Sequence, residues 1–470
     1  MTPDLKRGGR SFLMIALVDM MLLVAAFQLG VVGADLFSYQ KFELHFGWST
    51  GNTSHMFGFV SASVLGIFAL GLYNPRLREP IRGVLRRLVL GLTIAFTLVS
   101  MLILIYPPLG VAPMIAIPAF IIATVFLTTF RVLLPRLRDL EMFRTRILVL
   151  GAGSRASVIE RRMRRRVDRQ NFTLVGYLPT PGDAADAVER SLQVPRTGRL
   201  LDLVDRYDVD EIVVACDERR NNLPLNELLE CKLRGVEIID LLEFIERETG
   251  QIAVDLVYPS WMIYSTGFRP ADNVRTQLDW LFNFSIAALL LLLAWPLMLG
   301  TALAIYLEDG RFGAPLLYRQ TRVGLHGRPF KILKFRSMRV DAEKHGAQWA
   351  KLNDDRITRV GHVIRKYRLD ELPQIFNVLR GDMGFVGPRP ERPEFVEKLQ
   401  EKLPFYAERH AVKPGLTGWA QLCYPYGATE EDALEKLKYD LYYIKHRSFL
   451  LDLFIFLQTA EVVLLKKGAR

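Results

Sequence analysis

The sequence predicts a membrane protein with three kinds of structure. These are an α-helical bundle of four membrane spans, a Rossmann-like α/β domain, and an α-rich domain joined to one side of the membrane by a re-entrant helix. Long apolar runs crowd the first third of the chain, strand-like and helix-like segments then alternate, and an isolated apolar stretch broken by proline precedes a charged C-terminal region. Of the 470 residues, 50% are hydrophobic and 24% are charged, a mixture typical of apolar spans joined to soluble domains.

Charge and cysteine content narrow the functional classes. The chain has 61 Lys and Arg against 50 Asp and Glu, a net charge of +11, which favours anionic partners. Its cysteines, Cys216, Cys231 and Cys423, show no CxxC spacing. This pattern excludes a disulfide scaffold and a thiolate metal site, and it fits a reducing, cytoplasmic setting.

Residues 1–140 are predicted to form the membrane bundle. Four apolar runs are long enough to cross about 30 Å of hydrocarbon; they cover 12–32, 56–73, 88–106 and 111–134. Basic residues gather before the first run, between the second and third, and after the fourth, whereas the other two loops hold only Lys41. Both ends of the bundle are therefore expected to face the cytoplasm. Asp19 lies inside the first run without an evident basic partner, and is either functional or satisfied within the bundle.

Residues 144–262 alternate between strand-like and helix-like segments, which predicts a parallel α/β sandwich. Its first turn carries Gly151, Gly153 and Ala156 in a G-x-G-x-x-A pattern, which can place a phosphate at a helix N-terminus. The second strand lacks the terminal acid that would bind a ribose. We therefore expect a degenerate Rossmann-like domain, with a tight structural turn favoured over a bound dinucleotide. The basic helix 161–166 offers a surface for a second copy of the chain, although a solvated face is the commoner use of such charges.

A further apolar stretch, 275–307, contains Trp295 and Pro296. Proline removes a helical hydrogen bond, so we expect a helix-break-helix with its bend at Pro296. A full crossing would place the basic region 308–470 outside the cell, against the positive-inside rule. A re-entrant helix that enters and leaves on the cytoplasmic side removes this conflict, and a proline-kinked spanning helix is the alternative.

The region 308–470 holds the densest cluster of chemically unusual residues. Asp370 and Glu371 precede Leu372-Pro373, and proline favours the first turn of a helix. We expect a helix over 372–379 whose N-terminus keeps Asp370 ionised and attracts phosphate. The basic residues around the two acids are Arg359, Arg365, Lys366, Arg368, Arg380, Arg389 and Arg392. An ionised carboxylate among arginines can attack a diphosphate, whereas a helix cap with surface ion pairs is the ordinary alternative.

Four strings in this region resemble those of a known family. They are KFRSM (334–338), RLDELPQIFNVLRGDM (368–383), VGPRPE (386–391) and KPGLTGWAQ (413–421). The strings are similar to those of the bacterial sugar transferases, the monotopic phosphoglycosyl transferases that are also called polyprenyl-phosphate hexose-1-phosphate transferases. The resemblance covers 278–470, and the parts upstream are similar to those of the family's large members. It departs at the bend, where the family often has serine before the proline and this chain has Trp295.

The resemblance implies transfer of hexose-1-phosphate from a UDP-sugar, with glucose or galactose expected, to undecaprenyl phosphate with release of UMP. Such a step starts exopolysaccharide, capsule or O-antigen assembly. By this resemblance Asp370 is the nucleophile of a phosphosugar-aspartyl intermediate and a ligand of Mg²⁺. Glu371 is its partner in a catalytic dyad and assists the acceptor or the Mg²⁺. Arg365 and Arg389 would hold phosphates. The implied location is the cytoplasmic face of the bacterial inner membrane, with membrane lipid as a partner and no nucleic acid.

Other residues are weaker candidates for substrate binding. Lys334 and Arg336 flank Phe335 and are candidates for binding phosphate or the membrane surface. The alternative is that they lie on a solvated strand edge. Arg368 directly precedes the acids. Trp419 is a candidate for stacking on uracil, although core packing explains it equally well.

Two other classes of function were weighed. A membrane-anchored nucleotide-sugar dehydratase or epimerase needs Tyr-x-x-x-Lys, which the sequence lacks. A non-catalytic scaffold would not need the two acids and their arginines. Because every candidate residue follows residue 278, we also expect a chain that begins near Asp272 to retain activity.

Overall fold

The structure is a computed structural model of the chain. It describes residues 4–37, 50–70, 72–73, 81–107, 111–138, 144–163, 169, 172–219, 222–268, 273–309, 313–342, 355–424, 427 and 429–464. Lys41 and residues 164–166 of the predicted basic helix lie outside these ranges. The chain divides into two compact units, 1–249 and 250–470, and each is described by itself.

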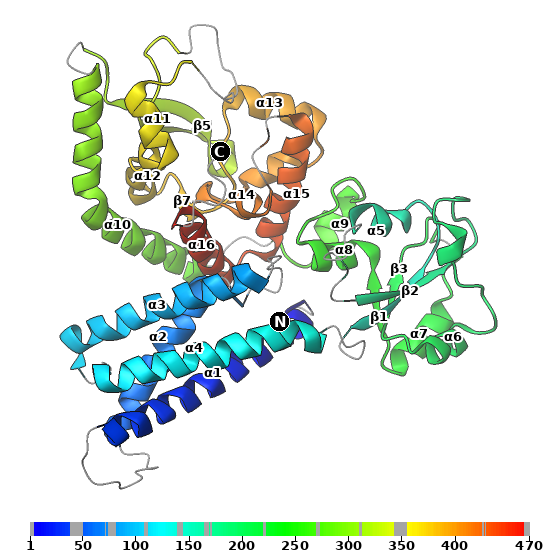
Figure 1. Cartoon of the computed structure of the whole chain (residues 1–470). Helices are drawn as coiled ribbons and strands as arrows, with labels where there is room; N and C mark the ends of the chain where they lie inside the picture. The colour runs from blue at the N-terminus through cyan, green and yellow to red at the C-terminus, as the bar shows by residue number, and fades with distance from the viewer. Residues whose placement is uncertain are drawn as a thin grey trace. The chain divides into compact units, whose positions relative to one another are not determined.

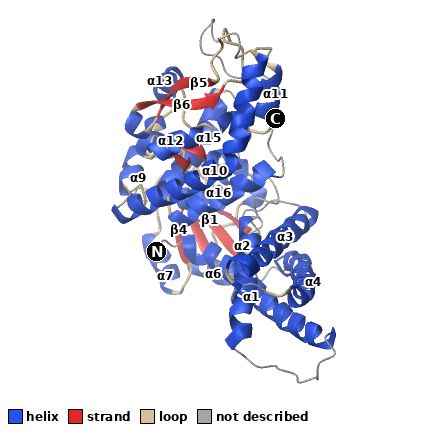
Figure 2. Cartoon of the chain, turned by 90° about the vertical axis from the view of Figure 1, so that its left-hand side faces the viewer, coloured by secondary structure: helices blue, strands red, loops and turns tan. Residues whose placement is uncertain are grey.

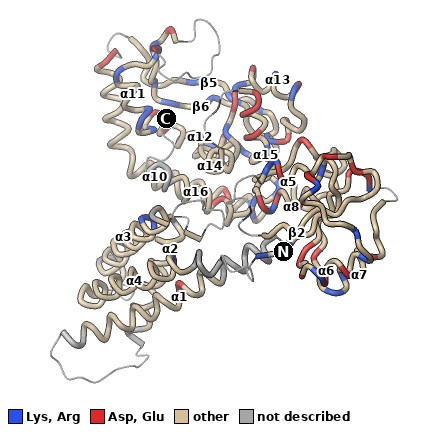
Figure 3. Tube along the Cα trace, turned by 45° about the vertical axis from the view of Figure 1, so that its right-hand side comes forward, with Lys and Arg blue, Asp and Glu red and all other residues tan. Residues whose placement is uncertain are grey.

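Four helices form the predicted bundle (Figure 1): α1 (Asp4–Phe37), α2 (Thr50–Ala69), α3 (Ile81–Ile105) and α4 (Pro113–Arg138). Helices α1 and α3 each pack against both α2 and α4. A Cβ atom on Gly66 of α2 would lie 2.3 Å from the carbonyl oxygen of Gly91 on α3, so these glycines allow the close backbone approach that helices in lipid use. Figure 3 shows few charged residues along these helices.

The lengths of the apolar stretches differ from the prediction in one helix. Helices α1, α3 and α4 contain stretches long and apolar enough to span a membrane, whereas the apolar part of α2, Thr53–Phe68, is shorter. Among the described residues, the fourth stretch of spanning length is α10 (Asn273–Glu308).

Asp19 has a basic partner that the sequence analysis missed. Nη2 of Arg131 on α4 lies 2.5 Å from Oδ2 of Asp19, and both side chains are buried. The Arg131 guanidinium also lies over the ring of Tyr73. The two charged residues are 112 positions apart in sequence, so local pattern gives no sign of the pair. The ion pair with Arg131 favours the interpretation of Asp19 as an acid that has a partner inside the bundle.

Asp19→Leu should destabilise the bundle because it leaves the buried guanidinium of Arg131 unpaired. Removing one partner of a buried ion pair costs about 3–5 kcal/mol. We expect a lower unfolding temperature in detergent, measured by circular dichroism, and recovery in the double variant Asp19→Leu, Arg131→Met. A double variant no more stable than the single one would contradict this explanation.

The rest of the first unit is a layered α/β domain. Its parallel sheet has the order β2-β1-β3-β4, formed by β1 (Thr145–Leu150), β2 (Phe172–Leu178), β3 (Glu211–Val214) and β4 (Glu237–Asp240). In Figure 1, α6 (Leu200–Tyr207) and α7 (Leu225–Leu233) cover one face, and α5 (Ser157–Arg162) and α8 (Leu241–Thr249) the other. The predicted alternation of strands and helices is confirmed.

The second unit surrounds two small sheets with helices (Figure 2). Strands β5 (Leu317–Val323) and β6 (Pro329–Phe335) form an antiparallel hairpin, and β7 (Gly384–Val386) pairs in parallel with β8 (Gly415–Thr417). The helices are α9 (Pro259–Tyr264), α10, α11 (Arg359–Lys366), α12 (Gln374–Arg380), α13 (Pro393–Lys402), α14 (Trp419–Cys423), α15 (Glu430–His446) and α16 (Phe449–Leu464). Residues 250–262, which the sequence assigned to the α/β domain, belong to this unit.

Helix α10 differs from the predicted helix-break-helix. It is assigned as one helix that runs through Pro296, and Figure 1 shows it changing direction along its length. At its start Arg275 pairs with Asp452 of α16, with Nη2 and Oδ2 3.0 Å apart. At its end Oε1 of Glu308 accepts a hydrogen bond of 2.8 Å from the backbone N–H of Arg359 on α11. Both ends of the helix therefore contact the same unit.

Candidate active site

Asp370 and Glu371 lie in a single 3-10 turn, Leu369–Glu371. Helix α12 begins at Gln374, two residues later than predicted, so Leu372 and Pro373 separate the acids from its first residue. Arg368, directly before the turn, has a left-handed backbone with φ of 57°, an uncommon conformation for a non-glycine residue. This reversal separates the acids from α11.

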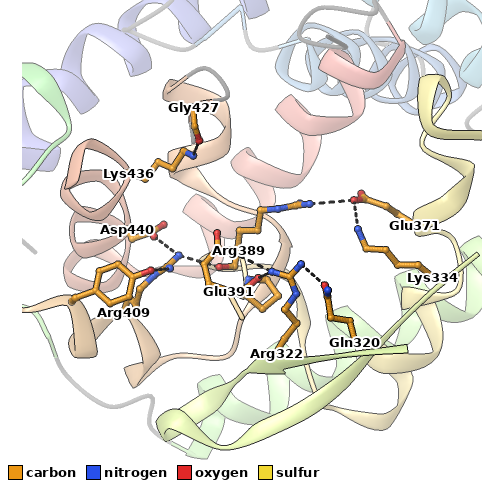
Figure 4. A network of polar contacts seen from close by, with 12 residues as sticks. Gln320, Arg322, Lys334, Glu371, Arg389, Glu391, Arg409, Gly427, Lys436 and Asp440 are labelled. Atoms are coloured by element: carbon orange, nitrogen blue, oxygen red, sulfur yellow. Dashed lines mark hydrogen bonds and ion pairs between the residues drawn. The ribbon is translucent and has the colours of Figure 1, made fainter. Parts of the chain in front are cut away.

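Glu371 is the anchor of the cationic cluster. Its Oε1 lies 3.1 Å from Nζ of Lys334, 3.4 Å from Nη2 of Arg389 and 3.7 Å from Nη1 of Arg368. Figure 4 shows Lys334 and Arg389 converging on it from different elements. Burial acts to raise the pKa of Glu371, but the charges of Lys334, Arg389 and Arg368 outweigh it and hold this pKa well below its usual range. Glu371 is therefore a fixed anion.

Asp370 has the opposite environment. Burial raises its pKa, and the charge of Glu371 raises it further, against the opposing charges of Lys334, Arg365 and Arg368. The expected stabilisation of its ionised form by a helix N-terminus does not prevail, because burial and the charge of Glu371 raise the pKa of Asp370. Its Oδ1 is buried and has no hydrogen-bond partner among the described residues. A buried carboxylate oxygen without a partner in the protein can bind a ligand.

Of the five basic residues predicted to bind substrate, four lie at the two acids, and Arg336 does not. Arg365 is close enough to act on the pKa of Asp370. Arg336 instead pairs with Asp309 after α10, with Nη1 2.8 Å from Oδ2, and donates a 2.6 Å hydrogen bond to the carbonyl of Pro315. The side chain of Arg336 is buried in these contacts, so it supports the fold and is not placed for phosphate binding.

Asn377 was not predicted as a site residue, yet it aligns the turn with Lys334. Its side chain is fully buried on α12; Oδ1 accepts a 3.0 Å hydrogen bond from the backbone N–H of Leu333, and Nδ2 donates one of 2.9 Å to the carbonyl of Lys331. These bonds fix α12 to β6, the strand that carries Lys334. A buried asparagine four residues after a proline gives no sequence signal of this role.

Arg409 and Asp440 were also missed, and they position Arg389. Nη2 of Arg409 donates to Oδ2 of Asp440 at 2.8 Å and to the carbonyl of Arg389 at 3.0 Å. Nη1 donates to the Tyr406 hydroxyl at 2.7 Å. Arg409 and Asp440 are both buried, and Figure 4 shows them on the opposite side of Arg389 from Glu371. Arg409 thus fixes the main chain of Arg389, and this main chain places the Arg389 side chain toward Glu371.

A small pocket lies at the loop that carries Arg389. Its lining includes Pro388, Arg389, Pro390, Pro414 and His410, and its cavity volume is about 10 Å³. Pockets that enclose drug-sized ligands have volumes of about 300–1,000 Å³. This pocket is therefore too small to enclose a nucleotide sugar.

Trp419 belongs to the core. It is buried, and its Nε1 donates a 3.1 Å hydrogen bond to the carbonyl of Gly250. Core packing is therefore the interpretation of Trp419 that the structure supports, rather than stacking on uracil.

The glycine turn of the α/β domain is filled by the chain's own carboxylates. Asp217 accepts hydrogen bonds of 2.8 Å from the backbone N–H groups of Ser154 and Arg155, and Asp183 accepts one of 2.8 Å from Ala152. Burial opposes ionisation of Asp217, yet these N–H groups lower its pKa. A Cβ on Gly153 would lie 2.1 Å from Oδ2 of Asp217. The groups that would bind a dinucleotide phosphate are occupied, which supports a structural turn.

Comparison with known proteins agrees with the site's position in the chain. Residues 274–466 match the family described as bacterial sugar transferase. A UDP-N-acetylgalactosamine-undecaprenyl-phosphate N-acetylgalactosaminephosphotransferase of Aeromonas hydrophila is 39% identical over 58% of this chain and 63% of its own length. A UDP-glucose:undecaprenyl-phosphate glucose-1-phosphate transferase of Escherichia coli K12 is 33% identical over 63% of each chain.

A shorter relative is covered more completely. A UDP-glucose:undecaprenyl-phosphate glucose-1-phosphate transferase of Caulobacter vibrioides is 44% identical over 39% of this chain and 68% of its own length. The chain spans about three fifths of the length of the Aeromonas and Escherichia proteins. Asp370 and Glu371, which we call the dyad, lie in the matched region together with their cations and the supporting helices. The chain belongs to the bacterial sugar transferase family.

Proposed function

We propose that the protein transfers hexose-1-phosphate from a UDP-sugar to undecaprenyl phosphate and releases UMP. The observation that carries this proposal is the pairing of a buried, unpartnered carboxylate oxygen on Asp370 with a neighbouring anion that collects three cations. Relatives that act on UDP-sugars and undecaprenyl phosphate support the substrate class. The hexose is either glucose or galactose in our proposal, and the transfer starts assembly of a surface polysaccharide.

The proposed reaction has two displacements at one phosphorus atom. A carboxylate oxygen of Asp370 attacks the phosphorus that carries the sugar, the bond to the UMP oxygen breaks, and UMP leaves with that oxygen. A phosphate oxygen of undecaprenyl phosphate then attacks the same phosphorus, and the aspartyl–phosphorus bond breaks to restore the carboxylate. Arg365 and Arg389 bind the phosphate oxygens, and Lys334 and Arg368 keep Glu371 in place beside them.

The site fits a divalent cation held jointly with substrate. No group of three His, Cys, Asp or Glu side chains able to hold a metal occurs in the described part of the chain. The free Oδ1 of Asp370 suits Mg²⁺, which usually binds one or two carboxylates together with substrate phosphates. When bound, Mg²⁺ would neutralise charge on the diphosphate.

We also propose that α10 is re-entrant, with the catalytic unit on the cytoplasmic face of the bacterial inner membrane. Its apolar side chains, such as Leu292, Leu293 and Trp295, are exposed, whereas both its ends contact one unit. A helix of 36 residues would be about 54 Å long if straight, so bending allows it to enter lipid and return.

Cysteine labelling tests this topology. Val274→Cys places a thiol at an exposed position in the first turn of α10, and Val340→Cys places one at an exposed position after the helix. Both should be protected from an impermeant maleimide in intact cells and should react after permeabilisation, with the unsubstituted chain as the background. Reaction of Val340→Cys alone in intact cells would show that α10 crosses the membrane.

Transfer activity provides the direct test of function. Membranes containing the protein should release UMP from UDP-glucose or UDP-galactose and label undecaprenyl phosphate with the sugar phosphate. EDTA should abolish both products, and added Mg²⁺ should restore them. Absence of lipid product across a panel of UDP-sugars would reject the proposed function.

A further inference from the structure

Residues 250–268, which we call the strap, precede α10 and lie outside the matched region 274–466. Despite this position the strap is part of the catalytic unit's core. Ile252 and Val254 have exposed fractions of 2% and 3%, and both join a cluster with Leu437 and Leu441 of α15. The strap therefore packs against these leucines and contributes to their burial.

Hydrogen bonds fix the first end of the strap. The backbone N–H of Ile252 donates to the carbonyl of Lys438 on α15 at 3.0 Å. The carbonyl of Gly250 accepts the 3.1 Å bond from the indole of Trp419 on α14. Both partners lie in elements of the catalytic unit.

The second end of the strap is fixed two turns further along α15. Nζ of Lys445 lies 4.5 Å from the ring centroid of Trp261. Gly267 has φ of 116°, and a Cβ there would lie 2.7 Å from the carbonyl oxygen of Lys445. Lys438 and Lys445 are about 10 Å apart along a helix, so the strap is fixed to α15 at two separate points.

Asp440 lies on α15 between these two points. It binds Arg409, which donates to the carbonyl of Arg389, and Nη2 of Arg389 lies 3.4 Å from Oε1 of Glu371. A continuous series of contacts thus leads from the strap to the dyad. A shift of α15 would move the guanidinium of Arg409. It would also move the backbone carbonyl of Arg389, to which that guanidinium donates, and so change the direction of the Arg389 side chain.

We propose that the strap positions the active site: by fixing α15 it sets the Asp440–Arg409 pair and so directs Arg389 toward the substrate diphosphate. This rests on the proposed function. It also replaces the expectation that a chain beginning near Asp272, a residue outside the described ranges, retains activity. Such a chain keeps the dyad but loses the strap, so the catalytic unit should require residues from Gly250 onward.

Two matched variants of the full-length chain test the proposal. Ile252→Ala truncates a buried strap residue, and Ile263→Ala makes the same change at a position with an exposed fraction of 76%. Ile252→Ala should raise KM for the UDP-sugar about tenfold, because small misplacements of binding groups have effects of this size or larger. Ile263→Ala should leave KM unchanged. Partial unfolding alone would lower kcat through the active fraction without raising KM, and an unchanged KM in Ile252→Ala would overturn the proposal.

A double variant tests whether the effect passes through Arg389. In the Arg389→Ala background, Ile252→Ala should add little further increase in KM, because residues acting through one contact are not additive. Full additivity would show that the strap acts elsewhere. If Ile252→Ala fails to fold, Ile252→Val should give a smaller rise in KM in the same direction, and no rise would count against the proposal.

Hydrogen exchange separates this proposal from the proposed function. Ile252→Ala should speed amide exchange in Tyr406–Ala411, the turn that carries Arg409, whereas Ile263→Ala should not. If the wild-type chain transfers no sugar phosphate yet this exchange responds, the function is wrong and the strap's coupling stands. If the wild-type chain is active and neither exchange nor KM responds, the strap proposal alone is wrong.

Discussion

Asp370→Asn should abolish sugar-phosphate transfer while leaving the fold intact. The amide is nearly isosteric with the carboxylate but cannot form the acyl phosphate on which the proposed reaction depends. Loss of a catalytic nucleophile lowers kcat by about 10³-fold or more. UMP release should fall with lipid product, because both follow the first displacement. Circular dichroism should show an unchanged helical signal, since Oδ1 makes no hydrogen bond that the amide would break.

The matched control is Asp355→Asn, the same substitution at an exposed position of the same unit. It should retain normal activity. Incubation of the wild-type chain with UDP-sugar alone should leave a phosphosugar adduct, and mass spectrometry should locate it on the peptide containing Asp370. An adduct on Glu371, or turnover in Asp370→Asn, would reject the assignment of the nucleophile.

Glu371→Gln should lower activity about a hundredfold and move the acid limb of the pH profile. The change removes the anion that collects Lys334, Arg368 and Arg389, so the cations lose their common partner. It also removes one of the two causes that raise the pKa of Asp370. The reacting carboxylate forms as pH rises through that pKa. A lower pKa therefore shifts the rise of kcat/KM to lower pH.

This result separates two roles for Glu371. If the acid limb shifts to lower pH and some activity remains, Glu371 is an anion that positions the cations and raises the pKa of Asp370. An unshifted limb would show that the ionisation of another group controls the rate. Glu371→Asp provides the control, because it keeps the charge; the limb should then stay near its wild-type position while activity falls through the shortened reach to Lys334.

The sequence predicted that Asp370, Glu371 and Arg389 lie in one region, but not the contacts that hold them there. Asp370, Glu371 and Arg389 occur in short sequence motifs that can be recognised without knowing the fold. Arg409 and Asp440 are 31 positions apart and meet only after α15 packs, so local pattern carries no trace of their contact. Arg336 was misassigned for the complementary reason: a basic residue beside Lys334 looks suited to phosphate, but the strand ends there and its side chain turns to Asp309.

The fold shows the same division. Apolar runs and the alternation of strands and helices are visible in short windows of the sequence. These local patterns predicted the bundle and the parallel sheet. The Asp19–Arg131 pair and the inclusion of 250–262 in the catalytic unit depend on packing between distant segments. The proline at position 296 predicted a break, yet the helix continues, because one lost backbone hydrogen bond does not end a helix whose neighbouring turns remain bonded.

The filled glycine turn of the α/β domain has a consequence for stoichiometry. Asp217 and Asp183 accept the hydrogen bonds of the backbone N–H groups in this turn, so these groups are not free to bind a nucleotide phosphate. A calorimetric titration of the full chain with a UDP-sugar analogue should therefore saturate at one equivalent per chain and fit a single class of affinity. Binding of a nucleotide-mimicking inhibitor would then report occupancy of the site at Asp370 and Glu371, without a contribution from a second site at the glycine turn.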